Sequence, residues 1–292
     1  MKRSNPHGSP EWSRGIAAGM LVILTAAAPL AADELSMTSV KDNTLIEDPS
    51  LALSAGASSS FYSGRVGSNG GNTLRRGVIA FDIAGVVPEG STITAVTLTL
   101  RCSKVPSGSA AQLIKLQRML ADWGEGNSVA FGGGGAPATP GSATWVNRFH
   151  PTDPWTTPGG DFSSTVSGSV MVGAVGNYTF ASTAAMVADV QAWLDDPANN
   201  FGWAVIGNET TPQQIRRFDT HESALPAWRP NLVITFEPPS TNPYDLNGDE
   251  TVNGADLAIL LSEWGEPGPA DFNGDGTVGG ADLTLLLAAW GL

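Results

Sequence analysis

The tail of this 292-residue chain contains a duplicated segment. Shifted by 26 positions, residues 245–265 align with residues 271–291, and fourteen of the twenty-one aligned residues are identical. Each copy begins with Asp, Asn and Gly residues and ends in a Leu-rich stretch that closes on Trp264 or Trp290. A duplication of this length predicts that the tail folds as two copies of a loop followed by a helix.

The polar residues of each copy have the spacing of a metal-binding loop. Side-chain oxygens recur at loop positions 1, 3, 5, 9 and 12 of the first copy, and a backbone carbonyl is expected at position 7. In the second copy Gly279 occupies position 9 and can act only through a water. Ca²⁺ takes about six to eight oxygen ligands, which this spacing supplies, whereas Mg²⁺ demands a tighter octahedron. We predict two calcium sites, formed by Asp245, Asn247, Asp249, Thr251, Asn253 and Asp256 in the first loop and by Asp271, Asn273, Asp275, Thr277 and Asp282 in the second.

The charge of the tail agrees with metal binding. Residues 244–292 contain nine Asp or Glu residues and no Lys or Arg. Without cations these carboxylates would repel one another in a module with little core, so calcium binding and folding are expected to be coupled. The alternative is that Asp and Asn only form local turns and helix caps. Helices are expected over 255–264 and 281–290, with Leu, Ile and Trp side chains packing the two copies together.

The duplicated loop-and-helix pattern resembles the type I dockerin, a module that docks proteins onto cohesins. The resemblance implies a cohesin-like protein as partner. Two departures from the family pattern stand out. Glu250 occupies position 6, where a glycine normally makes the turn, so the first loop should carry backbone strain of about 1 kcal/mol and bind calcium less tightly than the second loop with its Gly276. The residues after position 9 are Gly-Ala in both copies, and the basic residues typical of the following helices are missing.

The N-terminus has the pattern of an export signal. Lys2, Arg3 and Arg14 precede an apolar run rich in Ala, Leu and Val that ends before Asp33. We predict that residues 1–32 form a signal peptide and that the mature chain has no membrane span; a retained anchor is the alternative. A bacterial protein that is secreted, extracellular or at the cell surface is therefore expected.

The region between signal and tail is predicted to be β-rich. Thirty-five Gly, 20 Pro and a charged fraction of 15% favour a turn-rich β architecture. We predict a mainly β fold, with a jelly-roll-like antiparallel β-sandwich over residues 38–237, a Pro-rich linker over 238–243, and a small C-terminal α-helical, EF-hand-like calcium module over 244–292. One helix is expected between Thr183, which can cap it, and Pro197, which ends it.

Cys102 is the single cysteine of the sequence, which excludes an intramolecular disulfide. It follows Val96, Leu98 and Leu100 in an alternating stretch whose other residues are polar. We therefore expect a buried small hydrophobe; the alternative is a reactive thiol.

The β-rich region also carries an ordered set of short motifs. Among them are Asp122-Trp123-Gly124-Glu125-Gly126, Ala143-Thr144-Trp145, Arg217-Phe218-Asp219-Thr220-His221-Glu222 and Arg229-Pro230-Asn231-Leu232. In this order they resemble the DNRLRE-type domain, a jelly-roll-like sandwich of secreted bacterial proteins related to carbohydrate-binding modules. The resemblance implies polysaccharide binding, with acidic sugars such as alginate known for some relatives.

Particular side chains could contact such a glycan. An exposed indole stacks on the apolar face of a sugar ring, and a guanidinium group holds a carboxylate through two parallel hydrogen bonds. The predicted ligand-binding residues are Trp123, Trp155, Arg216, Arg217 and Trp228. The alternatives are that the Trp side chains pack in the core or the loops and that an Arg pairs with Asp219 or Glu222.

Other function classes are disfavoured. The formal net charge of −13 argues against nucleic-acid binding. The sequence has no nucleophile-elbow motif, no phosphate-binding glycine loop and no zinc-type Cys/His spacing, and no carboxylate pair is marked as acid and nucleophile. His150 and His221 are expected to be structural or solvent-facing. We therefore predict that the protein is not an enzyme.

The leading hypothesis is a secreted, non-catalytic protein that binds polysaccharide or cell-surface glycan through its β domain and docks through its calcium-binding tail. One alternative is a structural or adhesive surface protein without glycan binding. Another is an accessory part of a polysaccharide-degrading system, either hydrolase or lyase. The glycan, a further metal in the β domain and the oligomeric state stay open at this point.

Overall fold

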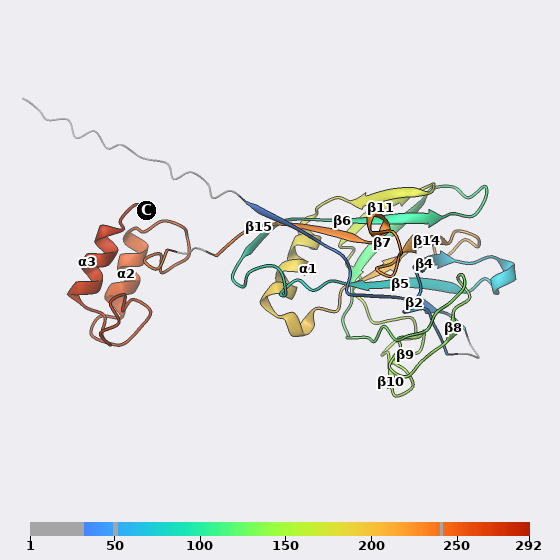
Figure 1. Ribbon diagram of the computed structural model, residues 1–292, viewed down its shortest axis with the longest axis horizontal. Coiled ribbons are helices and arrows are strands. Elements are labelled where there is room, and N and C mark those ends of the chain that lie inside the picture. The colour runs from blue at the N-terminus through green and yellow to red at the C-terminus, as the bar shows by residue number, and fades with distance from the viewer. Residues whose placement is uncertain (1–31, 49–51, 240–241) are drawn as a thin grey trace, which may run out of the picture.

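The computed structural model describes residues 32–48, 52–239 and 242–292 (Figure 1). Residues 1–31 of the predicted signal peptide and residues 240–241 of the predicted linker lie outside this set. Within it the chain is mainly β, which confirms the predicted class, and its C-terminal segment is helical.

Eleven strands of the described chain form one antiparallel sheet. Its order is β1-β15-β6-β14-β4-β5-β13-β7-β11, with β12 added on β6 and β2 on β5. These strands are β1 Asp33–Met37, β2 Lys41–Ile46, β4 Ser60–Arg65, β5 Leu74–Ala80, β6 Thr92–Lys104, β7 Gln112–Arg118, β11 Gly168–Val172, β12 Gly176–Phe180, β13 Trp203–Ile206, β14 Arg216–Asp219 and β15 Asn231–Glu237.

Strand β4 joins the two halves of this sheet. Along most of its length β4 pairs with β14, and its last two residues, Gly64 and Arg65, pair with β5. Side chains from β6 and β14 on one half and from β7 and β13 on the other belong to the same buried cluster. The sheet therefore curls until its two halves face each other across a common core. The observed sheet is continuous where two separate sheets were expected, and the jelly-roll assignment stays a prediction.

The alternation along β6 shows how the sequence selects the inward face. Val96, Leu98, Leu100 and Cys102 are fully buried, and the residues between them are partly exposed. This is the predicted arrangement of a strand with one apolar face. Cys102 is a free thiol in the core, and burial raises its pKa. The prediction of a buried small hydrophobe is confirmed.

One helix covers an end of the core. Helix α1, Ala184–Asp195, begins where the Thr183 hydroxyl accepts a hydrogen bond from the Met186 backbone N–H (3.0 Å), as its sequence predicts. Its Trp193 ring packs edge-on against Trp203 of β13, with ring centroids 4.6 Å apart. The buried Asp189 carboxylate accepts a hydrogen bond from Trp203 Nε1 (2.8 Å). The helix is thus fixed to the sheet by both apolar and polar contacts.

Long loops on the outer side of the sheet build a second core. Residues 119–167 contain only the short strands β8, β9 and β10, at Ala136–Pro137, Asn147–Phe149 and Asp153–Pro154; β8 pairs with β3, Leu53–Ser54. Trp123 and Trp155 from these loops are buried against Leu45, Val78 and Ala204 of the sheet. Single turns of 3₁₀ helix complete the domain at Ser68–Gly70, Pro197–Asn199 and Pro226–Trp228.

The C-terminal module has its own core. Helices α2, Gly254–Ser262, and α3, Gly280–Ala288, bury Leu260 and Leu286 between them. Both helices begin one residue before and end two residues before the predicted ranges of 255–264 and 281–290. The rings of Tyr244 and Phe272 meet edge-on, with centroids 4.9 Å apart.

Burial of Cys102 leads to a test of reactivity. Its thiol is 0% exposed, so a thiol reagent can reach it only when the sheet opens. We expect the native protein to react with Ellman's reagent at least ~100-fold more slowly than the protein unfolded in guanidinium. Absorbance of the released thiolate measures both rates. Equal rates in the two states would contradict the packing described here.

Candidate functional site

Carboxylate oxygens converge at the first loop of the C-terminal module. One oxygen from each of Asp245, Asp249 and Asp256 lies within 4.8 Å of the others. Backbone donors orient them, because the N–H groups of Gly248 and Asp249 donate to Asp245 Oδ1 at 2.9 and 3.1 Å. Short loop turns thus hold the charged oxygens in place without any basic side chain in the module.

The second loop repeats these contacts. The backbone N–H groups of Asp275 and Gly276 donate to the two oxygens of Asp271 at 3.1 and 2.8 Å. The equivalent bonds to Asp245 in the first loop come from Asp249 and Glu250. The duplication seen in the sequence is therefore also a duplication of backbone conformation.

The last acidic residue of each loop connects it to the following helix. Asp256 and Asp282 are 0% exposed, and each accepts hydrogen bonds from backbone N–H groups on both sides of its loop. Asp256 also closes a capping box with Asn253 at the start of α2. Buried carboxylates at helix N-termini interact favourably with the helix dipole and leave an oxygen-rich site beside the loop.

Hydrogen bonds favour the ionised form of the exposed carboxylates. Donation from the Asn247 side chain lowers the pKa of Asp249, and donation from Asn273 lowers that of Asp275. Ionised carboxylates and neutral amide oxygens are the ligands that a hard cation prefers. The residues present fit Ca²⁺, which when bound would neutralise the loop carboxylates.

The two loops differ at position 6. Glu250 has φ +66°, a left-handed conformation that non-glycine residues adopt only with strain, whereas Gly276 has φ +96°. The first loop thus makes the expected left-handed turn at position 6 with Glu250, where the second loop has Gly276.

The Trp residues at equivalent positions of the two copies do not pack these copies together as predicted. Trp264 and Trp290 follow the helices and are 48% and 45% exposed. Leu261 and Leu287, also at equivalent positions of the two copies, are 52% and 50% exposed. The Leu positions that do form the core are Leu260 and Leu286. Each copy therefore presents an exposed Leu and an exposed Trp.

Three of the predicted glycan-contacting residues are buried. Trp123 and Trp155 are 1% and 4% exposed, and their indole N–H groups donate to the carbonyls of Phe201 and Thr144 at 2.9 Å each. Arg216 is 0% exposed and donates to backbone carbonyls, including that of Val172 at 3.1 Å. The prediction that these side chains meet a sugar is wrong for this structure, because they satisfy buried backbone groups instead.

Arg217 and Trp228 remain at the surface. Arg217 lies on the outer face of β14 and donates from Nε to the Ser103 hydroxyl at 2.9 Å. Trp228 is 38% exposed, and the Arg101 guanidinium lies 4.3 Å from the centre of its ring. Arg217 differs from Arg216 because neighbouring side chains on β14 point to opposite faces of the sheet.

Arg217 lines a cationic hollow of about 470 Å³. Its charged lining residues are Arg75, Lys104 and Arg217, and it contains no carboxylate. The aromatic ring of Tyr62 and the backbone of Gly132 to Gly134 form part of its wall. Arg217 and Lys104 are paired across β14 and β6, and like charges this close disfavour each other unless an anion lies between them. The sequence does not indicate that these three cations form one cluster, because they are far apart along it.

A comparison with known families agrees with the architecture of the tail. Residues 243–289 match the family model described as dockerin type I domain. Domains of this family bind calcium and bind cohesins. A search of curated proteins found no match for the chain. Among the described residues no helix is both long and apolar enough to cross a membrane. The C-terminal segment is thus similar to dockerin type I domains, a family that binds calcium.

The strained turn in the first loop can be relieved by substitution. We expect Glu250→Gly to tighten calcium binding at loop 1 about fivefold, which corresponds to removing about 1 kcal/mol of strain. The mirror variant, Gly276→Glu, should weaken loop 2 by a similar factor. Titration calorimetry of the full chain measures both sites. If neither variant changes its own loop, the difference at position 6 has no bearing on affinity.

Proposed function

We propose that this is a secreted, non-catalytic protein whose β domain binds an acidic polysaccharide and whose tail, folded around two calcium ions, docks onto a cohesin-like protein. The glycan part rests on one observation above others, the cationic hollow in a chain of formal net charge −13. The docking part rests on the family match of the tail together with its exposed apolar side chains.

The hollow has the chemistry that a uronate chain needs. Guanidinium and ammonium groups donate several hydrogen bonds to a carboxylate, and these charge-assisted bonds are roughly twice as strong as neutral ones. An acidic protein repels polyanions at long range, so recognition has to come from a local cluster of cations. Lys104 is exposed and Arg217 half-buried, which leaves both within reach of a ligand. The proposal also includes the assignment of the β domain as a jelly-roll-like sandwich of the DNRLRE type.

The tail has a surface suited to a protein partner. Leu261, Trp264, Leu287 and Trp290 are each about half exposed and occupy equivalent positions of the two copies. Exposed large apolar side chains on a small module are typical of an interaction surface, and Trp is enriched among residues that dominate binding energy. Calcium would hold each loop against its helix and so keep these side chains in position.

Docking can be tested by truncating the exposed Trp residues. We expect Trp264→Ala combined with Trp290→Ala to weaken calcium-dependent binding to a type I cohesin at least ~30-fold, because an anchoring Trp contributes about 2 kcal/mol or more. Surface plasmon resonance measures the affinity, and circular dichroism checks that the helices persist. Phe131→Ala is the matched control, since Phe131 is fully exposed on the β domain. If the wild-type protein does not bind a type I cohesin in saturating calcium, the docking part of the proposal is refuted.

Glycan binding has its own test. We expect Arg217→Gln combined with Lys104→Gln to weaken binding to alginate about tenfold or more, through loss of charge-assisted hydrogen bonds. Affinity electrophoresis through gels containing alginate or a neutral glucan measures retention. Lys115→Gln on β7 removes a charge elsewhere and should leave retention unchanged.

Other outcomes of that experiment favour the alternatives. A wild-type protein retained by no acidic or neutral glycan would instead indicate a structural or adhesive surface protein. If the wild-type protein releases sugar products from the glycan and Glu222→Gln abolishes that release, the result would indicate an enzyme.

A further inference from the structure

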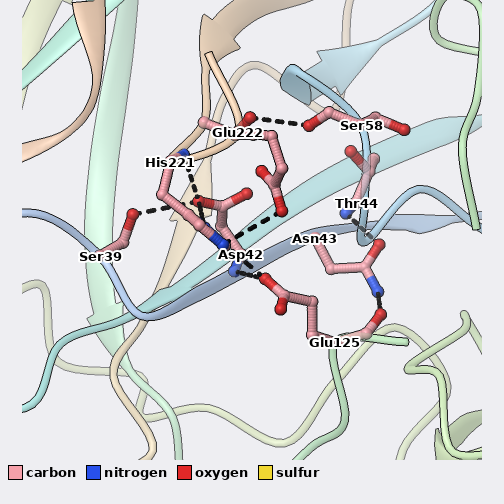
Figure 2. A network of polar contacts seen from close by, with 9 residues as sticks. Ser39, Asp42, Asn43, Thr44, Ser58, Glu125, His221 and Glu222 are labelled. Carbon is pink, nitrogen blue, oxygen red and sulfur yellow. Dashed lines mark hydrogen bonds and ion pairs between the residues drawn. The ribbon is translucent and has the colours of Figure 1, made fainter. Parts of the chain in front are cut away.

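Four ionisable side chains from distant parts of the β domain meet at one point (Figure 2). Asp42 lies on β2, Glu125 lies in the loop after β7, and His221 and Glu222 follow β14. One potential ligand atom from each lies within 4.8 Å of the other three. Figure 2 shows the four side chains pointing toward one another.

The imidazole lies at the centre of these contacts. His221 Nδ1 is 3.0 Å from Asp42 Oδ2 and 3.7 Å from Glu125 Oε1. On the other side of the ring, Nε2 is 3.2 Å from Glu222 Oε1. The ring therefore lies within ion-pair distance of all three carboxylates.

Two carboxylate oxygens in the cluster lack a partner. Asp42 is 0% exposed, and its Oδ1 accepts no hydrogen bond. Glu222 Oε2 is likewise buried and unpaired. A buried carboxylate oxygen without a partner costs free energy, so such atoms are rare unless a ligand or an ion completes them. The two unpaired oxygens favour a cation site at this cluster.

The surrounding backbone holds the cluster in place. The Asp42 N–H donates to Glu125 Oε1 at 2.7 Å, and the Asn43 side chain donates to the Glu125 carbonyl at 2.8 Å. Gly56 approaches that carbonyl so closely that a Cβ on it would lie only 1.9 Å from the oxygen. The contacts of Asn43 and Gly56 with the Glu125 backbone thus fix the chain at the cluster without involving the charged groups.

The charges of the cluster are not balanced by basic residues. Within the part of the chain that the structure describes, Asp42, Glu125 and Glu222 make ion pairs with His221 alone. Lys41 lies next to Asp42 in sequence but donates to Asp122 and the Trp123 carbonyl, both at 2.7 Å. Three crowded carboxylates with one imidazole leave room for a divalent charge.

We propose that Asp42, Glu125, His221 and Glu222 form a binding site for one divalent metal ion of the zinc or manganese type, separate from the calcium loops of the tail. The ligand set selects this class, because an imidazole nitrogen suits Zn²⁺ and carboxylate oxygens suit Mn²⁺, whereas Ca²⁺ prefers oxygen ligands throughout. His221 would bind as the neutral imidazole, so metal uptake releases its proton.

Such an ion would connect three segments of the fold. It would join strand β2, the loop after β7 and the segment after β14, which are adjacent in space and remote in sequence. His221, Glu125 and Glu222 are about a quarter exposed, so an ion can enter from solvent. Because the ion binds only the folded state, it should stabilise the β domain.

The test uses the full chain with its calcium loops already saturated by Ca²⁺. Zn²⁺ and Mn²⁺ are then titrated separately by calorimetry, and the melting of the β domain is followed by circular dichroism. We expect one equivalent of Zn²⁺ or Mn²⁺ to bind and the melting temperature to rise by roughly 5 °C at about 100 times the dissociation constant.

Variants assign the ion to the cluster. His221→Gln and Glu222→Gln should each weaken metal binding at least tenfold, and His150→Gln, which removes a histidine elsewhere, should not. Glu222→Gln keeps the size of a partly exposed side chain, so it serves if His221→Gln fails to fold. Absence of binding by the wild type, binding unchanged in both cluster variants, or binding of Ca²⁺ alone would each overturn the proposal.

Discussion

The packing of the two inward faces of the curled sheet is the interaction on which the rest of the structure depends. Phe61 of β4 stacks on Phe218 of β14 with ring centroids 5.5 Å apart, at the strand that joins the halves. Alternation on each strand sends apolar residues inward and polar residues outward. The outer side is then free to carry the long loops and the cationic hollow.

Electrostatics divides the molecule into regions of opposite character. The tail concentrates carboxylates in two loops that fit a hard cation, and the Asp42 cluster adds a third acidic site that includes a nitrogen ligand. The hollow around Arg217 gathers cations on the outer face of the same domain. Like charges gather in each region, and a bound ion or a charged ligand would relieve the repulsion between them.

Local patterns predicted much of this architecture, and contacts between distant segments explain the failures. The duplicated loops, the alternation of β6 and the cap at Thr183 depend on neighbours within a few residues, so the sequence alone indicated them. Trp123 and Trp155 were misassigned because loops fold over the outer face of the sheet and bury them. No periodicity in the sequence predicts this burial. Arg216 is buried and Arg217 is partly exposed, because neighbouring residues of β14 face opposite sides of the sheet. The contact between Asp42 and His221 spans 179 residues and left no sequence signal.

The burial of the single cysteine has a consequence for how the protein matures. Cys102 has no second thiol in this sequence with which to form a bridge, and the strands around it hold together through apolar packing. The fold of the β domain therefore does not depend on the redox state of the compartment in which the protein folds. The same structure should assemble in a reducing cytoplasm and in an oxidising extracellular medium, without catalysts of disulfide exchange.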